Sequence, residues 1–198
     1  MNLLAPEWYS HAMDGSDEAL VRRVAGGDEQ ALELLYTGHA AALLRYAAQL
    51  TGDRGLAEEA LQDTFVAVWQ GAAVRFGGGS TVRTWLFGIC RNQAGKRLRS
   101  APPPALPLDA AAAMASALAT PDEVALARAD VSAVGAALAR LPAGHREVLH
   151  LVFAAELPMT EVAALLDIPL GTVKSRLFNA RAALARALPQ LTAKEAGR

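Results

Sequence analysis

Residues 159–184 constrain the fold more than any other segment, because two apolar stripes of helical period are separated there by a short break. Val162, Ala163 and Leu166 fall on one face of a first helix, for which Thr160 is the predicted N-cap. The break is Asp167-Ile168-Pro169, since proline removes a backbone donor and restricts the residue before it. The second stripe consists of Val173, Leu177, Ala180 and Leu184. The segment predicts a helix-turn-helix.

The second helix of this motif has the composition of a DNA-reading element. Small and hydrogen-bonding side chains lie opposite its apolar stripe, cations flank them, and no acidic residue occurs from Leu170 to Leu188. Such a helix suits entry into a DNA major groove. An ordinary helical hairpin with a solvated basic face is the alternative. The tight turn and the lack of carboxylates favour DNA binding.

The rest of the periodic sequence is also helical. One stripe contains Leu32, Leu35, His39, Leu43, Tyr46 and Leu50 and ends at Thr51-Gly52-Asp53. A second contains Leu61, Phe65, Val68 and Ala72 and stops near the three glycines at 77–79. A third helix, capped by Ser80 or Thr81, carries Val82, Trp85, Leu86, Ile89 and Gln93 on its inner side. These helices predict a compact domain over residues 17–99, preceded by a tail at 1–16.

A second helical domain is expected beyond a proline-rich break. Residues 102–107 contain four prolines, which stop a helix, so we interpret 100–121 as a flexible Pro/Ala-rich linker that leaves the distance between the two domains unfixed. The second domain then spans 122–190, before a tail at 191–198. Its first stripe runs Val124, Ala127, Val131, Val134, Leu138 and Leu141. A helix starting at Leu141-Pro142 has Val148, Leu149, Val152 and Phe153 inside, and the helix-turn-helix completes the domain. The predicted fold class is all-α.

Charge and composition exclude several classes of protein. Residues 1–63 hold eleven acids and four bases, whereas 64–108 hold six bases and no acid, which indicates one surface for a basic protein partner and another for phosphates. No apolar run reaches the roughly 18 to 20 residues of a membrane span, and no signal peptide is evident. Cys90 is the single cysteine, so no disulfide within the chain is expected. We expect a cytoplasmic protein.

Enzyme chemistry is not expected either. His39, His145 and His150 lack the spacing of a helical metal site, and His39 lies on an apolar stripe, where packing explains it. The sequence contains neither a glycine-rich phosphate motif nor a nucleophile elbow, and Cys90 has no histidine partner in view. We therefore expect no catalytic residue, no metal and no cofactor.

Both halves of the chain resemble one family. The second half resembles the C-terminal promoter-reading domain, region 4, of bacterial sigma factors. The matching segments are LPAGHREVL at 141–149, EVAALL at 161–166 and IPLGTVKSRL at 168–177. The first half resembles region 2 of the same family, and the matching segments occur in the same order: TGD at 51–53, AEE at 57–59, QDTF at 62–65, Trp69 and WLFGICRN at 85–92. The similarity is to the small extracytoplasmic-function (ECF) type, whose members direct promoter-specific initiation by RNA polymerase. Asp167 stands where many relatives carry glycine, which implies a turn conformation that Asp tolerates less well.

The resemblance assigns roles to three sets of residues. Docking on core RNA polymerase is implied for Glu59, Gln62, Asp63, Phe65 and Trp69. Recognition and melting of the downstream (−10) element are implied for Arg75, Phe76, Arg83, Trp85, Arg91, Asn92 and Lys96, since flipped bases need a pocket and the exposed strand needs cations. For Trp85, packing in the core is the competing interpretation. Contacts to the upstream (−35) element are implied for Thr172, Lys174, Ser175, Arg176, Asn179 and Arg181.

The expected partners are therefore core RNA polymerase and promoter DNA. An anti-sigma factor often covers such surfaces in the family, and this sequence is compatible with one; insertion into a membrane is not expected. The alternative is a stand-alone helix-turn-helix regulator that binds DNA without polymerase. Such a regulator needs a dimerisation or ligand-binding domain, whereas residues 17–99 match a polymerase-docking domain.

Overall fold

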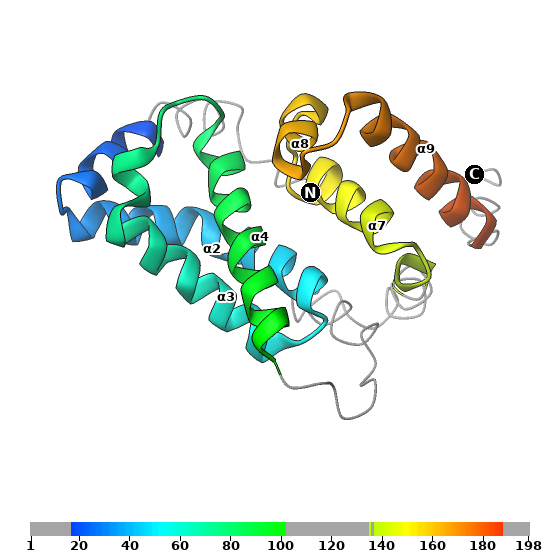
Figure 1. The fold of residues 1–198 in the computed structure, drawn as a ribbon, viewed down its shortest axis with the longest axis horizontal. Coiled ribbons are helices and arrows are strands. Elements are labelled where there is room, and N and C mark those ends of the chain that lie inside the picture. Colours follow the sequence, from blue (N-terminus) through cyan, green and yellow to red (C-terminus); the bar gives the residue numbers. More distant parts are fainter. Residues whose placement is uncertain (1–16, 102–134, 136, 188–198) are drawn as a thin grey trace, which may run out of the picture.

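The structure is a computed structural model that describes residues 17–101, 135 and 137–187. Within these residues every regular element is helical and no strand occurs, so the all-α prediction is confirmed. The helices form two groups, one on each side of Figure 1. The predicted linker lies outside the described residues beyond 101, as do both tails and the stripe positions Val124, Ala127, Val131 and Val134.

The first group consists of a helix at 17–25, α2 (Glu29–Thr51), α3 (Arg54–Ala67), the short turns η1 (Val68–Ala72) and η2 (Ala73–Arg75), and α4 (Val82–Ser100). Aspartates begin two of these helices: Asp28 accepts from the Ala31 amide at 3.1 Å and Asp53 from the Leu56 amide at 2.8 Å. Gly52, in the left-handed region at φ 67°, ends α2 as its sequence predicts.

The first core has the composition predicted from the stripes on α2 and α3. Leu35, Leu43 and Tyr46 are fully buried, and His39 is buried with its Nε2 2.8 Å from an Asp17 carboxylate oxygen. On α4, Thr81 is the N-cap, but the predicted inner face was partly wrong. Phe87, Cys90 and Ala94 are fully buried together with Leu86, whereas Trp85, Ile89 and Gln93 are half-exposed. The cause is that α4 packs on both α2 and α3 and buries a face rotated from the expected one.

The second group consists of α7 (Ala143–Leu149), η3 (His150–Ala154), α8 (Met159–Leu166) and α9 (Leu170–Ala187). Val148 and Leu149 are buried as expected, but Phe153 is 52% exposed and Leu151 is buried instead. The reason is that η3 is a π-helical turn, in which the Ala155 amide bonds to the His150 carbonyl at 2.9 Å. The extra residue in this turn rotates the side chains that follow.

The helix-turn-helix is formed by α8 and α9, with Val162, Leu166, Val173, Leu177 and Ala180 buried between them and α7. The predicted cap was wrong: α8 begins at Met159 after Pro158, whose extended backbone leads into the helix, so Thr160 lies inside the first turn. Asp167 adopts the left-handed conformation, at φ 52°, that its position implied. Glu156 does the same at φ 54°, between η3 and α8.

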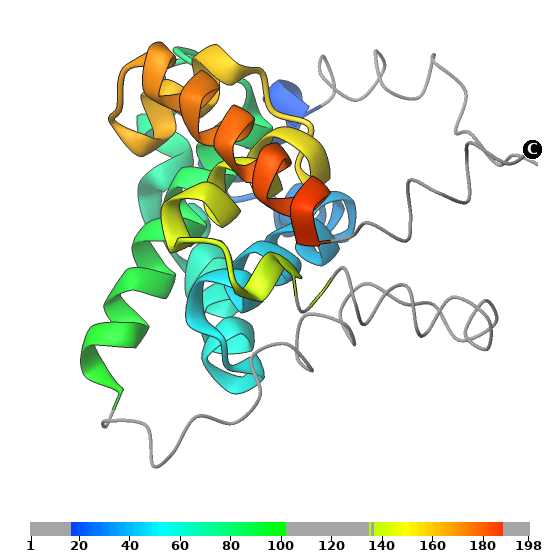
Figure 2. The same ribbon diagram turned by 90° about the vertical axis from the view of Figure 1, so that its right-hand side faces the viewer.

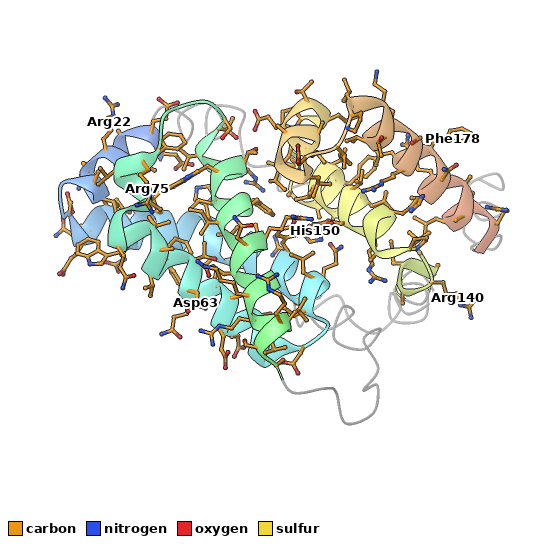
Figure 3. The ribbon with its side chains drawn as sticks, in the orientation of Figure 1. Arg22, Asp63, Arg75, Arg140, His150 and Phe178 are labelled. Carbon is orange, nitrogen blue, oxygen red and sulfur yellow. The ribbon has the colours of Figure 1, made fainter. Side chains whose placement is uncertain are left out.

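The two groups touch each other, which the expectation of an unfixed distance did not anticipate. Helix α8 packs on α4, and η3 approaches α2 (Figures 1 and 2). The rings of Tyr46 and His150 lie 5.5 Å apart across this boundary, and Figure 3 shows His150 between the two groups.

Candidate nucleic-acid and polymerase interfaces

Helix α9 presents part of the predicted upstream-element set to solvent. Lys174, Ser175, Asn179 and Arg181 are exposed, whereas Thr172 and Arg176 are half-buried. The Ser175 hydroxyl donates to the Thr172 carbonyl of its own helix at 3.0 Å. The exposed members share one side of α9, because its opposite stripe is buried against α7 and α8.

The two arginines of this set are held in place by the second domain itself. The Arg176 guanidinium lies against Gly144 on α7, 3.1 Å from the position that a Cβ there would occupy, so a larger residue at 144 would require the Arg176 side chain to shift. The Arg181 guanidinium lies 5.3 Å from the centre of the Phe153 ring, a cation–π contact. Arg181 is thus positioned beside the exposed face, and Arg176 lies along α7.

Phe178 is a residue that the sequence interpretation missed. Its side chain is 74% exposed, and Figure 3 shows it on the side of α9 that faces away from the first domain. A signal was present, because Phe178 is three residues from Ser175 and one from Asn179, on the face assigned to DNA. An exposed aromatic ring there is unusual for a solvated helix face.

Helix α4 divides the predicted downstream-element set into two groups. Trp85, Asn92 and Lys96, at spacings of seven and four, share one face; Asn92 and Lys96 are exposed and Trp85 is half-exposed. The Phe76 ring lies 5.0 Å from that of Trp85, so the loop before α4 brings two aromatic rings together. Arg75 is exposed at the start of this loop.

The other two cations of the set, Arg83 and Arg91, contact the second domain. The Arg83 Nε donates to the Ala155 carbonyl at 2.8 Å. The Arg91 Nε donates to Glu147 Oε1 at 2.9 Å, and the same oxygen accepts from the Tyr46 hydroxyl at 2.9 Å. Burial works against the charge on Arg91, but its hydrogen bond to Glu147 raises the Arg91 pKa above its usual value.

The acidic pair of the polymerase-docking set is engaged within the first domain. Arg97, near the end of α4, donates to Asp63 Oδ2 at 2.6 Å and to Glu59 Oε2 at 2.9 Å. All three side chains remain partly exposed, so the pairing leaves the carboxylates accessible to a partner.

A groove lies next to this acidic pair, between α2 and α3. Gln62 and Trp69 line it together with Leu32, Tyr36, Leu44, Phe65 and Val66, and Glu29 and Glu58 are at its rim. Trp69 is 41% exposed, whereas Phe65 is buried against the Tyr36 ring at 4.9 Å. Phe65 therefore supports the groove from beneath and lies in the core, as its place on the predicted apolar stripe indicates.

Two buried ionisable groups, Cys90 and His150, have shifted pKa values. Burial raises the pKa of the Cys90 thiol to about 12, so it remains protonated at neutral pH. Burial and then the charge of Arg45 lower the pKa of His150 to about 4. Among residues 17–101 and 137–187 no three His, Cys, Asp or Glu side chains gather as metal ligands. None of the described helices is long and apolar enough to span a bilayer.

Comparison with known proteins places both halves of the chain in one family. Residues 35–102 match Sigma-70 region 2, and residues 137–186 match Sigma-70, region 4. The ECF RNA polymerase sigma factor SigL of Mycobacterium tuberculosis is 36% identical over 173 residues, which cover 87% of this chain and 97% of SigL. The ECF RNA polymerase sigma-E factor of Escherichia coli is 31% identical over 182 residues, covering 85% of this chain and 92% of that factor.

Solved structures agree. The chain resembles CnrH in its complex with the cytosolic domain of CnrY, with a TM-score of 0.64 and 26% identity over 88% of this chain and 97% of CnrH. It also resembles the sigma factor RpoE in complex with the anti-sigma factor NepR from Bartonella quintana, with a TM-score of 0.60 and 26% identity over 82% of this chain and 96% of RpoE. The chain therefore belongs to the ECF family of RNA polymerase sigma factors.

Proposed function

We propose that this ECF sigma factor reads the upstream promoter element with the exposed face of α9 and holds the melted downstream element on α4. It docks on core RNA polymerase through α3. The family sets the overall task, which is to direct promoter-specific transcription initiation by the polymerase. Residues 17–99 and 122–190 act as the two functional units, joined by 100–121. Bond-forming chemistry belongs to the polymerase, and we assign no catalytic residue to this chain.

For the upstream element, the exposed side of α9 carries the proposal. Lys174, Ser175 and Asn179 offer donors and acceptors to base edges, and Arg181 is positioned by Phe153 to reach a phosphate or a base. Thr172 and Arg176 lie at the margin of this face. Phe178 adds an apolar surface suited to the methyl group of thymine.

For the downstream element, the neighbouring rings of Phe76 and Trp85 carry the proposal. Half-exposed aromatic rings provide faces on which unpaired bases stack. Arg75, Asn92 and Lys96 lie in the same loop and on the same face of α4, where they can hold the phosphates of the separated strand. Arg83 and Arg91 contribute to this surface once they are released from the second domain.

For polymerase docking, the Glu59–Asp63 pair and the adjoining groove carry the proposal. Carboxylates beside an apolar groove fit a partner surface that combines basic and apolar side chains. Gln62 and Trp69 would contact the polymerase directly, and Phe65 would hold the groove in shape. Two similar structures contain a bound partner, the cytosolic domain of CnrY and the anti-sigma factor NepR, so we include an anti-sigma factor among the partners of this chain.

Run-off transcription with core enzyme on a genomic promoter library tests the assignment. Asp63→Ala should impair holoenzyme assembly, measured by co-elution with core enzyme, whereas Glu18→Ala, which removes an exposed acid of the helix at 17–25 that does not line the groove, should not. Asn179→Ala should relax selectivity at upstream positions without impairing assembly. Tight sequence-specific binding of duplex DNA by the free chain, with no transcription in the presence of core enzyme, would instead favour a stand-alone regulator.

A further inference from the structure

Arg176 is the one charged member of the upstream-element set that does not lie on the exposed side of α9. Lys174 and Arg181 are exposed, whereas Arg176 is half-buried. Thr172, four residues earlier, is half-buried as well, so the two share a flank of the helix. Helix α7 packs on α9, and the Arg176 guanidinium lies against Gly144 in the first turn of α7 (Figure 1). This arginine is therefore turned away from the exposed face and toward α7.

The approach of the Arg176 guanidinium to Gly144 is close. A Cβ at residue 144 would lie 3.1 Å from Nη1 of Arg176, 3.2 Å from its Cζ and 3.7 Å from its Nε. At none of the other described glycines does a neighbouring atom come nearer to the Cβ position. The space that a side chain at 144 would need is thus occupied by the guanidinium.

The backbone does not require glycine at 144. Unlike four of the other described glycines, Gly144 does not have a positive φ. Glycine is also one of the poorest helix formers, and Gly144 lies inside α7. The room that Gly144 leaves for Arg176 therefore gives a reason for a residue that the helix itself disfavours.

No carboxylate holds Arg176 beside α7. Within the part of the chain that the structure describes, its guanidinium takes part in no ion pair, and α9 contains no acidic residue. An arginine side chain has many rotamers, so the space around it decides where the guanidinium lies. A side chain that fills the space at 144 would therefore move the guanidinium elsewhere on α9.

The position open to a displaced guanidinium is on the base-reading side. Asn179, three residues beyond Arg176, is exposed and adjoins it on the helix surface. An arginine in the major groove forms two hydrogen bonds with guanine, so a displaced Arg176 would add a preference for that base. This step rests on the proposed function, because it takes the exposed face of α9 as the face that reads the upstream element.

We propose that Gly144 is a specificity-determining residue of the upstream-element interface. By leaving room for Arg176 beside α7, it keeps this arginine away from the base edges. The exposed side chains of α9 then read the element without it. The positive charge of Arg176 still attracts the DNA backbone, but it selects no base.

The test replaces Gly144 by leucine, which fills the space, forms helix better than glycine and offers Arg176 no acceptor. Ala143→Leu is the matched control, because Ala143 is exposed in the same turn of α7. Gly144→Ala is a second variant, which should act in the same direction and less strongly, since it adds only the Cβ. Circular dichroism verifies that each variant is folded.

Displacement of the guanidinium is measured in the full-length chain. Phenylglyoxal modifies accessible arginines, and mass spectrometry of the peptide that contains Arg176 gives its rate of modification. Gly144→Leu should raise this rate several-fold, because the half-buried guanidinium becomes exposed. Ala143→Leu should leave the rate unchanged.

Base preference is measured as binding of holoenzyme to duplexes that carry each base in turn at each upstream position. Gly144→Leu should gain a preference for guanine at one position, on the order of tenfold. The double variant Gly144→Leu/Arg176→Ala should lose this gain. Arg176→Ala alone should lower the affinity for all sequences equally.

Four results would overturn the proposal. An unchanged modification rate in Gly144→Leu would show that residue 144 does not place the guanidinium. A raised rate with unchanged base preferences would show that its position does not determine specificity. A guanine preference that persists in the double variant would not come from Arg176. Altered base preferences in Arg176→Ala alone would show that this arginine already reads a base.

A failure of the proposed function gives a different result. If α9 does not read the upstream element, Asn179→Ala will leave the base preferences of the holoenzyme unchanged. If only the role of Gly144 is wrong, Asn179→Ala will still change them.

Discussion

Truncation of Phe178 to alanine should weaken promoter binding and leave the fold intact. The side chain is 74% exposed, so its removal opens no cavity, and the free energy of unfolding should change by less than about 0.5 kcal/mol. An aromatic side chain offers roughly 200 Å² of surface, so about 150 Å² of Phe178 is available for contact. If DNA covers half of that area, the loss is about 2 kcal/mol at ~25 cal/mol per Å², or roughly 30-fold in affinity.

The assay is binding of holoenzyme to a promoter duplex in which uracil replaces the thymines of the upstream element one at a time. Uracil lacks the methyl group, so at one position the wild-type protein should lose affinity whereas Phe178→Ala should not. Leu34→Ala, which truncates an exposed apolar side chain on α2, is the control. An equal loss on thymine and uracil templates, or no loss at all, would refute the methyl contact.

Three further outcomes are expected. Arg97→Ala should release Glu59 and Asp63 and strengthen binding to core polymerase in titrations. Arg99→Ala, which removes an exposed arginine two residues further along α4, should leave binding unchanged. Weaker binding of Arg97→Ala would mean that Arg97 organises the docking site. Lys174→Ala should lower promoter affinity for all sequences and reduce the slope of log K against log salt by about 0.9, and an unchanged slope would exclude a phosphate contact. Acidification should separate the two domains. The His150 ring lies 5.5 Å from that of Tyr46, whose hydroxyl donates to Glu147, the carboxylate that also pairs with Arg91. Burial and then the charge of Arg45 lower the His150 pKa to about 4. The form with separated domains therefore binds more protons between about pH 6.5 and 4, and the contact between the domains loses stability as pH falls through that window. The measurement is energy transfer between dyes on Thr37→Cys and Ala185→Cys, which are exposed sites on α2 and α9. A response to pH that is equal in wild type and His150→Asn would contradict this prediction.

Much of the fold could be predicted from local sequence. Side-chain period predicted the buried stripes of α2 and α9, and backbone preference predicted the glycine that ends α2 and a cap at Ser80 or Thr81, because both act within a few residues. The left-handed conformation of Asp167 was implied by the family resemblance, since many relatives carry glycine there. Errors arose where a distant element decides. The buried face of α4 is set by two helices packing on it together, and a π-helical turn moved Phe153 outward; neither is encoded by nearest neighbours.

The candidate site likewise has features that local sequence predicted and features that depend on distant parts of the chain. Motif order and the absence of carboxylates on α9 were enough to indicate DNA reading and the family, because those features lie along single helices. Only the tertiary structure showed that Phe178 is exposed among polar neighbours and that Arg83 and Arg91 pair with the second domain. Sequence determined the helices and their chemistry, since these depend on local period and residue type. The tertiary structure decided which arginines pair with an oxygen of the other domain. An ion pair between Arg91 and Glu147, 56 positions apart, exists only when packing brings the two side chains within hydrogen-bond distance.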